Sequence, residues 1–214
     1  MALNTLRKVT SFSRRMGKGF NNPAKSFYAE YIEKYKISAN ELKNYNNLIL
    51  EIGFGAGEHL LGLSNKYNDH MVIGAEPYLD GVVKVLKTIT KYNISNLKLF
   101  PDDVNLLLTE EAKEKFNLIY ILFPDPWPKT RHHKRRIINQ NILTKVFNSL
   151  KDSGKLVIAT DHLEYAEWIH NELEIFGKFK VARSHVLPHN YTPTKYHTKA
   201  LKVGSEVNFF NCIK

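Results

Sequence analysis

The first chemically informative segment is a glycine-rich turn between an apolar run and a helical pattern, Leu50-Glu51-Ile52-Gly53-Phe54-Gly55-Ala56-Gly57-Glu58. Glycine at such a turn lets backbone amides approach a bound ligand closely. The spacing is G-x-G-x-G, whereas the dinucleotide fingerprint places its third glycine one residue later, where this chain has Glu58. We therefore expect Gly53, Gly55 and Gly57 to bind S-adenosyl-L-methionine rather than NAD.

Three acidic side chains lie at the ends of three successive apolar runs, where the parallel strands of an open sheet would end. Glu51 would repel a pyrophosphate, but it suits the amino group of a methionine moiety. We predict that Glu76 binds the ribose hydroxyls and that Asp103 accepts a hydrogen bond from the adenine amino group. One such acid would more often cap the following helix, but three in succession favour a nucleoside-containing cofactor.

A fourth acid lies between two prolines in the segment Pro124-Asp125-Pro126-Trp127, directly after the apolar run 118–123. The prolines restrict the backbone and hold the carboxylate of Asp125 beyond the end of a strand. The segment continues into the basic run 129–136. Such a run can be a solvated loop, but beside a fixed acid and an aromatic ring it indicates phosphate contacts around a base pocket.

The charge of the chain indicates an anionic partner. The 214 residues include 31 Lys and Arg against 21 Asp and Glu, which gives a formal net charge of +10. The basic residues gather in three stretches without Asp or Glu, within 7–18, 129–136 and 178–202. A solvated face would mix both signs, so we expect these stretches to bind nucleic acid.

Composition and single residues exclude other classes of protein. No apolar run approaches the roughly 20 residues that cross a bilayer, and the N-terminal residues lack the apolar segment of a signal peptide, so we expect a cytoplasmic protein without membrane contact. Cys212, the single cysteine, cannot form an internal disulfide. The adjacent His132 and His133 lack the thiolate or carboxylate neighbours of a metal site. We expect neither a metal nor an obligate protein partner.

The elements that must position these residues alternate apolar runs with helical patterns. This alternation predicts an α/β fold with one open, mostly parallel seven-stranded sheet of the Rossmann-like type, helices on both faces and an antiparallel last strand. We expect a flexible basic arm over 1–22 and a single domain over 23–214. After a helix over 23–35, runs and helical patterns alternate in the order 48–52, 59–67, 71–75, 81–90, 97–100, 104–113, 116–123, 137–150, 155–160, 165–176 and 179–185, before a long loop and a closing strand within 203–210.

The combined pattern resembles the bacterial tRNA (guanine-N7)-methyltransferase family, a family of class I S-adenosylmethionine-dependent methyltransferases, over nearly the whole chain. The Pro-Asp-Pro-Trp segment with its basic tail is highly specific, whereas many methyltransferases share the glycine turn. The matching pieces are Ser11-Phe12-Ser13-Arg14-Arg15-Met16-Gly17, Leu50-Glu51-Ile52-Gly53-Phe54-Gly55, Phe123-Pro124-Asp125-Pro126-Trp127, His133-Lys134-Arg135-Arg136, Ala159-Thr160-Asp161 and Thr194-Lys195-Tyr196.

The resemblance implies roles for particular residues and a tRNA substrate. The cofactor site would be lined by Glu51, Glu76, Asp103 and Asp125. The substrate would be contacted by Lys129, Arg135, Asp161, Thr194, Lys195, Tyr196 and His197. The implied reaction methylates guanosine 46 of the tRNA variable loop and yields S-adenosyl-L-homocysteine. The final motif departs from the family, which usually has Thr-Lys-Phe-Glu followed by an Arg and a Gly where this chain has Thr194-Lys195-Tyr196-His197 and then Lys199-Ala200. His197 in place of Glu removes a carboxylate, and it can accept a hydrogen bond only through one neutral ring nitrogen.

The chemistry of guanine explains why the enzyme needs no general base to remove a proton. Guanine N7 has a free lone pair, so it can attack the sulfonium methyl without first losing a proton. Positive charge then moves from sulfur to the guanine ring, and a fixed carboxylate would stabilise it, so Asp125 is the predicted catalytic residue. We expect Arg14, Arg15, the run 129–136 and Lys195 to contact phosphates.

Three other functions stay open from the sequence. A methyltransferase for a small molecule or a protein would share the cofactor site, although the three basic stretches disfavour it. A tRNA-binding module without catalysis is indicated only by His197 and the altered final motif. A dehydrogenase ranks last, because Glu58 replaces the expected glycine.

Overall fold

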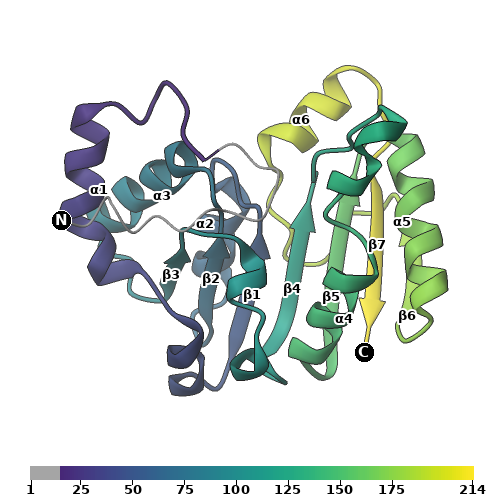
Figure 1. The fold of residues 1–214 in the computed structure, drawn as a ribbon, viewed down its shortest axis with the longest axis horizontal. Helices are drawn as coiled ribbons and strands as arrows, with labels where there is room; N and C mark the ends of the chain where they lie inside the picture. Colours follow the sequence, from purple (N-terminus) through teal and green to yellow (C-terminus); the bar gives the residue numbers. More distant parts are fainter. Residues whose placement is uncertain (1–14) are drawn as a thin grey trace.

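Residues 15–214, which the computed structural model describes, form one seven-stranded sheet with helices around it (Figure 1). The sheet order is β3-β2-β1-β4-β5-β7-β6, and among the described strands β7 alone runs antiparallel. The predicted sheet, with its antiparallel last strand, is confirmed. The strands are β1 (Leu48–Ile52), β2 (Met71–Ala75), β3 (Leu97–Phe100), β4 (Phe116–Leu122), β5 (Leu150–Thr160), β6 (Lys180–Ser184) and β7 (Asn208–Ile213).

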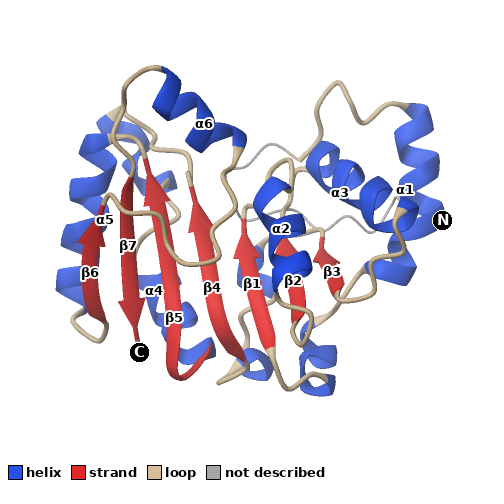
Figure 2. Ribbon diagram, turned by 180° about the vertical axis from the view of Figure 1, so that it is seen from behind, coloured by secondary structure: helices blue, strands red, loops and turns tan. Residues whose placement is uncertain are grey.

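Helices cover both faces of the sheet, as Figure 2 shows with α2 in front and α4 behind. On β1, Leu48, Leu50 and Ile52 join the apolar cluster under α4 and α5, whereas Ile49 joins the cluster under α1, α2 and α3. This alternation is the two-residue period of a strand buried on both faces. The helices are α1 (Asn22–Tyr35), α2 (Glu58–Lys66), α3 (Leu79–Lys91), α4 (Gln140–Ser149), α5 (Leu163–Phe176) and α6 (Lys195–Lys202). None in the described chain is long and apolar enough to cross a membrane.

Two stretches differ from the predicted elements. The helix predicted over 104–113 is instead two 3-10 turns, η2 (Val104–Leu106) and η3 (Glu110–Ala112), because Thr109 between them has an extended backbone. The loop predicted after residue 187 contains α6, which Thr194 caps by accepting a hydrogen bond from the backbone N–H of His197. Two further 3-10 turns are η1 (Ala39–Asn44) and η4 (Thr130–Arg135), and the closing strand begins only at residue 208.

The described part of the predicted N-terminal arm, residues 15–22, lies against the start of α3 and the loop after β3. The Arg15 guanidinium is 3.3 Å from Asp102, and the backbone N–H of Gly19 donates to Asp80. Phe20 is buried and meets Tyr28 of α1 edge to face. In this structure Arg15 is paired with a carboxylate, and the flexible arm over 1–22 stays a prediction. The predictions for 1–14, including the Ser11 to Arg14 motif, lie outside the described residues.

Arg136 is one of the largest fully buried side chains in the described chain. Its Nε donates to the carbonyl of Pro126 and its Nη2 to Glu164 of α5. The guanidinium carbon lies 5.0 Å from the ring centre of Tyr165 and 4.7 Å from that of Trp168. The phosphate contact predicted for this member of the basic run is therefore wrong. Arg136 instead ties the segment after β4 to α5.

We expect Arg136→Ala to lower the free energy of unfolding by roughly 3 kcal/mol, because it leaves a cavity between two rings and a carbonyl without its donor. Urea denaturation of the variant and the parent measures this loss. The exposed Arg131 gives a control, Arg131→Ala, with the same charge change and a loss within about 0.5 kcal/mol. Equal stability of the two variants would contradict a structural role for Arg136.

Candidate active site

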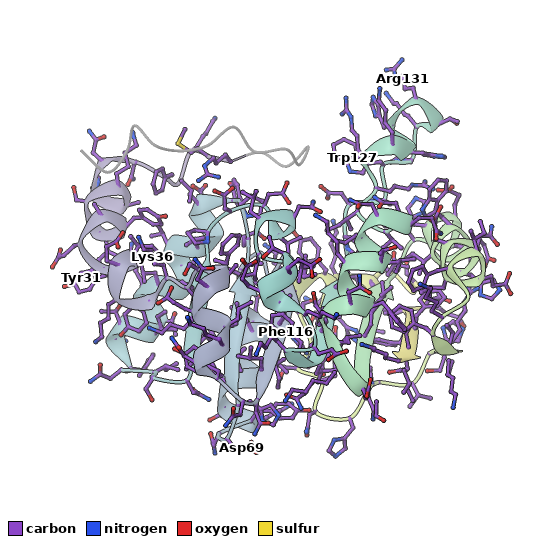
Figure 3. All side chains as sticks on the ribbon, turned by 60° about the horizontal axis from the view of Figure 1, so that its bottom comes forward. Tyr31, Lys36, Asp69, Phe116, Trp127 and Arg131 are labelled. Atoms are coloured by element: carbon purple, nitrogen blue, oxygen red, sulfur yellow. The ribbon has the colours of Figure 1, made fainter. Side chains whose placement is uncertain are left out.

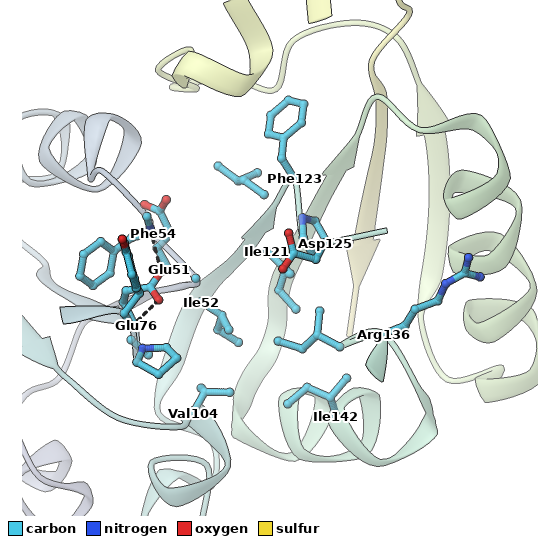
Figure 4. Close-up of a pocket in the computed structure, with 18 of the residues that line it drawn as sticks. Glu51, Ile52, Phe54, Glu76, Val104, Ile121, Phe123, Asp125, Arg136 and Ile142 are labelled. Carbon is cyan, nitrogen blue, oxygen red and sulfur yellow. Dashed lines mark hydrogen bonds between the residues drawn. The ribbon is translucent and has the colours of Figure 1, made fainter. Parts of the chain in front are cut away.

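A cavity of about 550 Å³ opens where β1, β2 and β4 end (Figure 4). The strands β1 and β4 are parallel neighbours, but the chain continues from β1 to β2 on one side and from β4 to β5 on the other. The loops that follow β1 and β4 therefore separate and leave a crevice. The four predicted acids Glu51, Glu76, Asp103 and Asp125 all line this cavity. Its volume is that of a site for a small organic molecule.

The glycine turn after β1 has left-handed backbone at each predicted glycine. The φ angles of Gly53, Gly55 and Gly57 are 73°, 54° and 82°, a region that other residues rarely adopt. Gly53 and Gly55 line the cavity, but Gly57 does not. A Cβ atom at Gly57 would lie 2.2 Å from a methyl of Val85, so this glycine instead allows α2 to start close against α3.

Glu76 connects the glycine turn to the loop after β2. One of its carboxylate oxygens accepts from the backbone N–H of Gly55 at 2.9 Å, and the other accepts from that of Tyr78 at 2.8 Å. Burial raises the pKa of the Glu76 carboxyl above its usual range; the two hydrogen bonds oppose this shift, and the charges of Asp125 and Glu51 add to it. Each oxygen keeps a second lone pair, so the fixed carboxylate can accept from a pair of hydroxyls.

Asp103 is buried and is the N-cap residue of η2, directly before Val104, which Figure 4 labels. Its Oδ1 accepts from both the backbone and the side-chain N–H groups of Asn105. The capping role that the sequence left open is therefore present. Asp103 nevertheless lines the cavity, so the cap also sets the position of the carboxyl group there.

The segment after β4 holds Asp125 between two residues with unusual backbone. Phe123 and Trp127 have φ angles of 51° and 44°, a conformation that is costly for large side chains and is concentrated at functional sites. Asp125 is exposed at the cavity, and the Arg135 guanidinium lies 4.9 Å from the ring centre of Trp127. The loop thus places an acid, an aromatic face and a cation at the opening of the cavity.

Comparison with known proteins identifies the family. Residues 45–210 match the family model described as "Putative methyltransferase". A tRNA (guanine-N(7)-)-methyltransferase of Wolbachia pipientis wMel is 35% identical over 216 residues, which cover 98% of this chain and 94% of that protein. This chain belongs to the tRNA (guanine-N7)-methyltransferase family.

Two other similar proteins show how far the similarity in sequence and in fold extends. A "Bifunctional methyltransferase" of Rickettsia conorii is 38% identical over 203 residues, or 93% of this chain, but the chain spans only 39% of that longer protein. A solved structure of an antibiotic related methyltransferase shares the fold with a TM-score of 0.60 and 20% identity, over 84% of this chain and 94% of that one. The family membership therefore rests on sequence, and the solved structure supports the fold.

The residues that the family resemblance assigned to the substrate separate into two groups. Thr194, Tyr196 and Arg135 line the cavity, and the exposed Tyr196 ring stacks on Phe123 with ring centres 6.3 Å apart. Outside the lining are Lys129, Asp161, Lys195 and His197. Of these, Asp161 borders a second hollow of about 530 Å³ together with Arg183 and His185.

His197, which replaces the usual Glu of the family, points into the protein. It is 5% exposed and packs among the rings of Phe123, Tyr191 and Phe209. Burial lowers the pKa of its imidazole, so the ring is neutral near neutral pH. In this arrangement the side chain lies outside the cavity lining, so its contact with the substrate stays a prediction.

His59 is a site residue that the sequence analysis missed. Its Nδ1 lies 3.0 Å from Oε2 of Glu51, with both side chains buried. A signal was present, because alternation along β1 places Glu51 on the Ile49 face, toward the helix that contains His59. Across the described chain, no group of three His, Cys, Asp or Glu could hold a metal ion.

We expect acid to destabilise the protein partly through His197. A base with a lowered folded-state pKa binds more protons when unfolded, so its stabilising contribution is complete above the unfolded pKa of about 6.5 and is lost as the pH falls through that range. Urea unfolding at about pH 7.5 and about pH 5.5 should show a smaller loss of stability for His197→Phe than for the parent. The exposed His189 supplies the control His189→Phe, and an unchanged pH dependence in His197→Phe would contradict the assignment.

Proposed function

We propose that this protein transfers the methyl group of S-adenosyl-L-methionine to N7 of guanosine 46 in tRNA and releases S-adenosyl-L-homocysteine. The main support is the cavity, where acids from the ends of four strands meet an aromatic and basic mouth. Membership of the tRNA (guanine-N7)-methyltransferase family supports guanine as the methylated base and N7 as the methylated atom. Guanosine 46 follows from the resemblance described above.

The lining residues fit the parts of such a cofactor. The buried Glu76 carboxylate, fixed by two backbone N–H groups, suits the ribose hydroxyls. Asp103 would accept from the adenine amino group, and Glu51 would bind the ammonium of the methionine part. When bound, the cofactor supplies an electrophilic methyl group on a positively charged sulfur. Gly53 and Gly55 leave room for it beside the backbone.

Asp125 is the proposed catalytic residue. Its carboxylate faces the cavity beyond β4, held by the flanking prolines and the constrained backbone at Phe123 and Trp127. Guanine N7 attacks without proton loss, so the protein needs to orient the base and to stabilise the positive charge that develops on it. The fixed charge of Asp125 performs the second task, and the exposed Tyr196 ring offers a surface on which the base can stack.

Basic side chains on two sides of the cavity would bind the tRNA backbone. Figure 3 shows Arg131 at the tip of the protruding segment that also bears Trp127. Lys129 and Lys134 are exposed on this segment, and Lys195, Lys199 and Lys202 are exposed on α6. Phosphate contacts of this kind set the position of an RNA without reading its sequence.

The reaction and its site are tested together with two tRNA transcripts that differ only in guanosine or adenosine at position 46. We expect labelled methyl from S-adenosyl-L-methionine to enter only the guanosine transcript. Label in both transcripts would move the site elsewhere in the tRNA. Label in neither, with cofactor still bound, would instead support the binding module without catalysis.

Asp125→Ala should lower the single-turnover rate of methyl transfer roughly a hundredfold, because a preorganised charge is lost from the transition state. The dissociation constant of S-adenosyl-L-homocysteine should change by less than about threefold, since the other acids remain. Asp125→Asn keeps the shape and removes the charge, so it should show the same pattern. The exposed Asp69 provides Asp69→Ala as a control, and equal losses of rate and affinity in Asp125→Ala would assign the residue to binding only.

A further inference from the structure

Glu51 and His59 form a buried pair beside the cavity. Glu51 lines the cavity and is 2% exposed, while the His59 side chain is fully buried. The 3.0 Å contact joins Nδ1 of the imidazole to Oε2 of the carboxylate. One carboxylate oxygen is therefore committed to the histidine, and the other is available to a ligand.

The surroundings hold the His59 ring in place. Its centre lies 4.5 Å from that of Tyr120 on β4 and 5.2 Å from that of Tyr191. Its second nitrogen, Nε2, is buried and has no hydrogen-bond partner in the described chain. Nδ1 is therefore the ring nitrogen that is placed to donate to the Glu51 carboxylate.

We propose that His59 is a positioning residue for recognition of the amino group of the methionine moiety. His59 donates through Nδ1 to one oxygen of Glu51. The donated hydrogen bond fixes the buried carboxylate in one orientation and compensates part of its desolvation. The other oxygen is thereby presented to a cationic amino group, and a ligand without that group gains nothing from the pair.

This inference rests on the proposed cofactor. Two nucleosides separate recognition of the amino-acid part from recognition of the adenosyl part. S-adenosyl-L-homocysteine has the amino group, whereas 5′-methylthioadenosine shares the adenosyl thioether and lacks the amino-acid part. Isothermal titration of the full chain with each nucleoside gives the two dissociation constants. The ratio of these constants isolates recognition of the amino-acid part from any general damage to the site.

Two substitutions of His59 form a matched pair. In His59→Asn the amide nitrogen takes the place of Nδ1, and in His59→Gln it takes the place of Nε2, where it cannot donate to Glu51. We expect His59→Gln to weaken S-adenosyl-L-homocysteine at least about tenfold and methylthioadenosine less than about twofold. His59→Asn should keep S-adenosyl-L-homocysteine within about threefold of the parent. His70, paired with Asp69 and outside the cavity lining, gives the control His70→Gln.

The outcomes distinguish this inference from the proposed function. Equal weakening of both nucleosides by His59→Gln, or no weakening of either, would overturn the positioning role alone. A parent protein that binds neither nucleoside would overturn the proposed function together with the inference. If His59→Gln fails to fold, Glu51→Gln in the otherwise unchanged chain must still weaken S-adenosyl-L-homocysteine selectively, and an unselective loss there also overturns the inference.

Discussion

The site depends on one constraint, the reversal of strand order between β1 and β4. Parallel strands end at the same edge of the sheet, and the loops after two neighbours can separate only where the chain turns to opposite sides. Residues that are far apart in sequence, such as Glu51, Glu76 and Asp125, therefore share one cavity. No single loop could place these three acids in one cavity.

The electrostatics of the cavity follow from this gathering of acids. Carboxylates in one crevice repel each other, and the raised pKa of Glu76 records both burial and the charges of Asp125 and Glu51. A cationic ligand would relieve that repulsion. Outside the cavity the sign reverses, because the exposed side chains of η4 and α6 are mainly basic. The charges of the protein would therefore complement a positively charged cofactor inside the cavity and a polyanion on the surface around it.

Local sequence signals predicted the sheet and most of the cavity, because a glycine turn, strand-end acids and a proline-flanked aspartate each act within a few residues of one another. The burial of Arg136 depends on two rings of α5, 29 and 32 residues further along the chain, and nothing in the basic run distinguishes it from its exposed neighbours. His59 was missed for a related reason, since its partner lies on a strand rather than on its own helix. These contacts between elements escaped prediction, as did α6 and the division of 104–113 into two 3-10 turns.

The exchange of the usual family Glu for His197 can be understood through packing. Tyr191 contacts both His59 and His197, so one aromatic cluster supports the Glu51–His59 pair and the start of α6. A carboxylate at position 197 with this orientation would be buried among rings without a cationic partner, which is costly, whereas a neutral imidazole belongs to such a cluster. The substitution thus removes a charge from a place where the surrounding rings could not have compensated it. Thr194 and Tyr196, at the start of the same helix, line the cavity, whereas His197 does not.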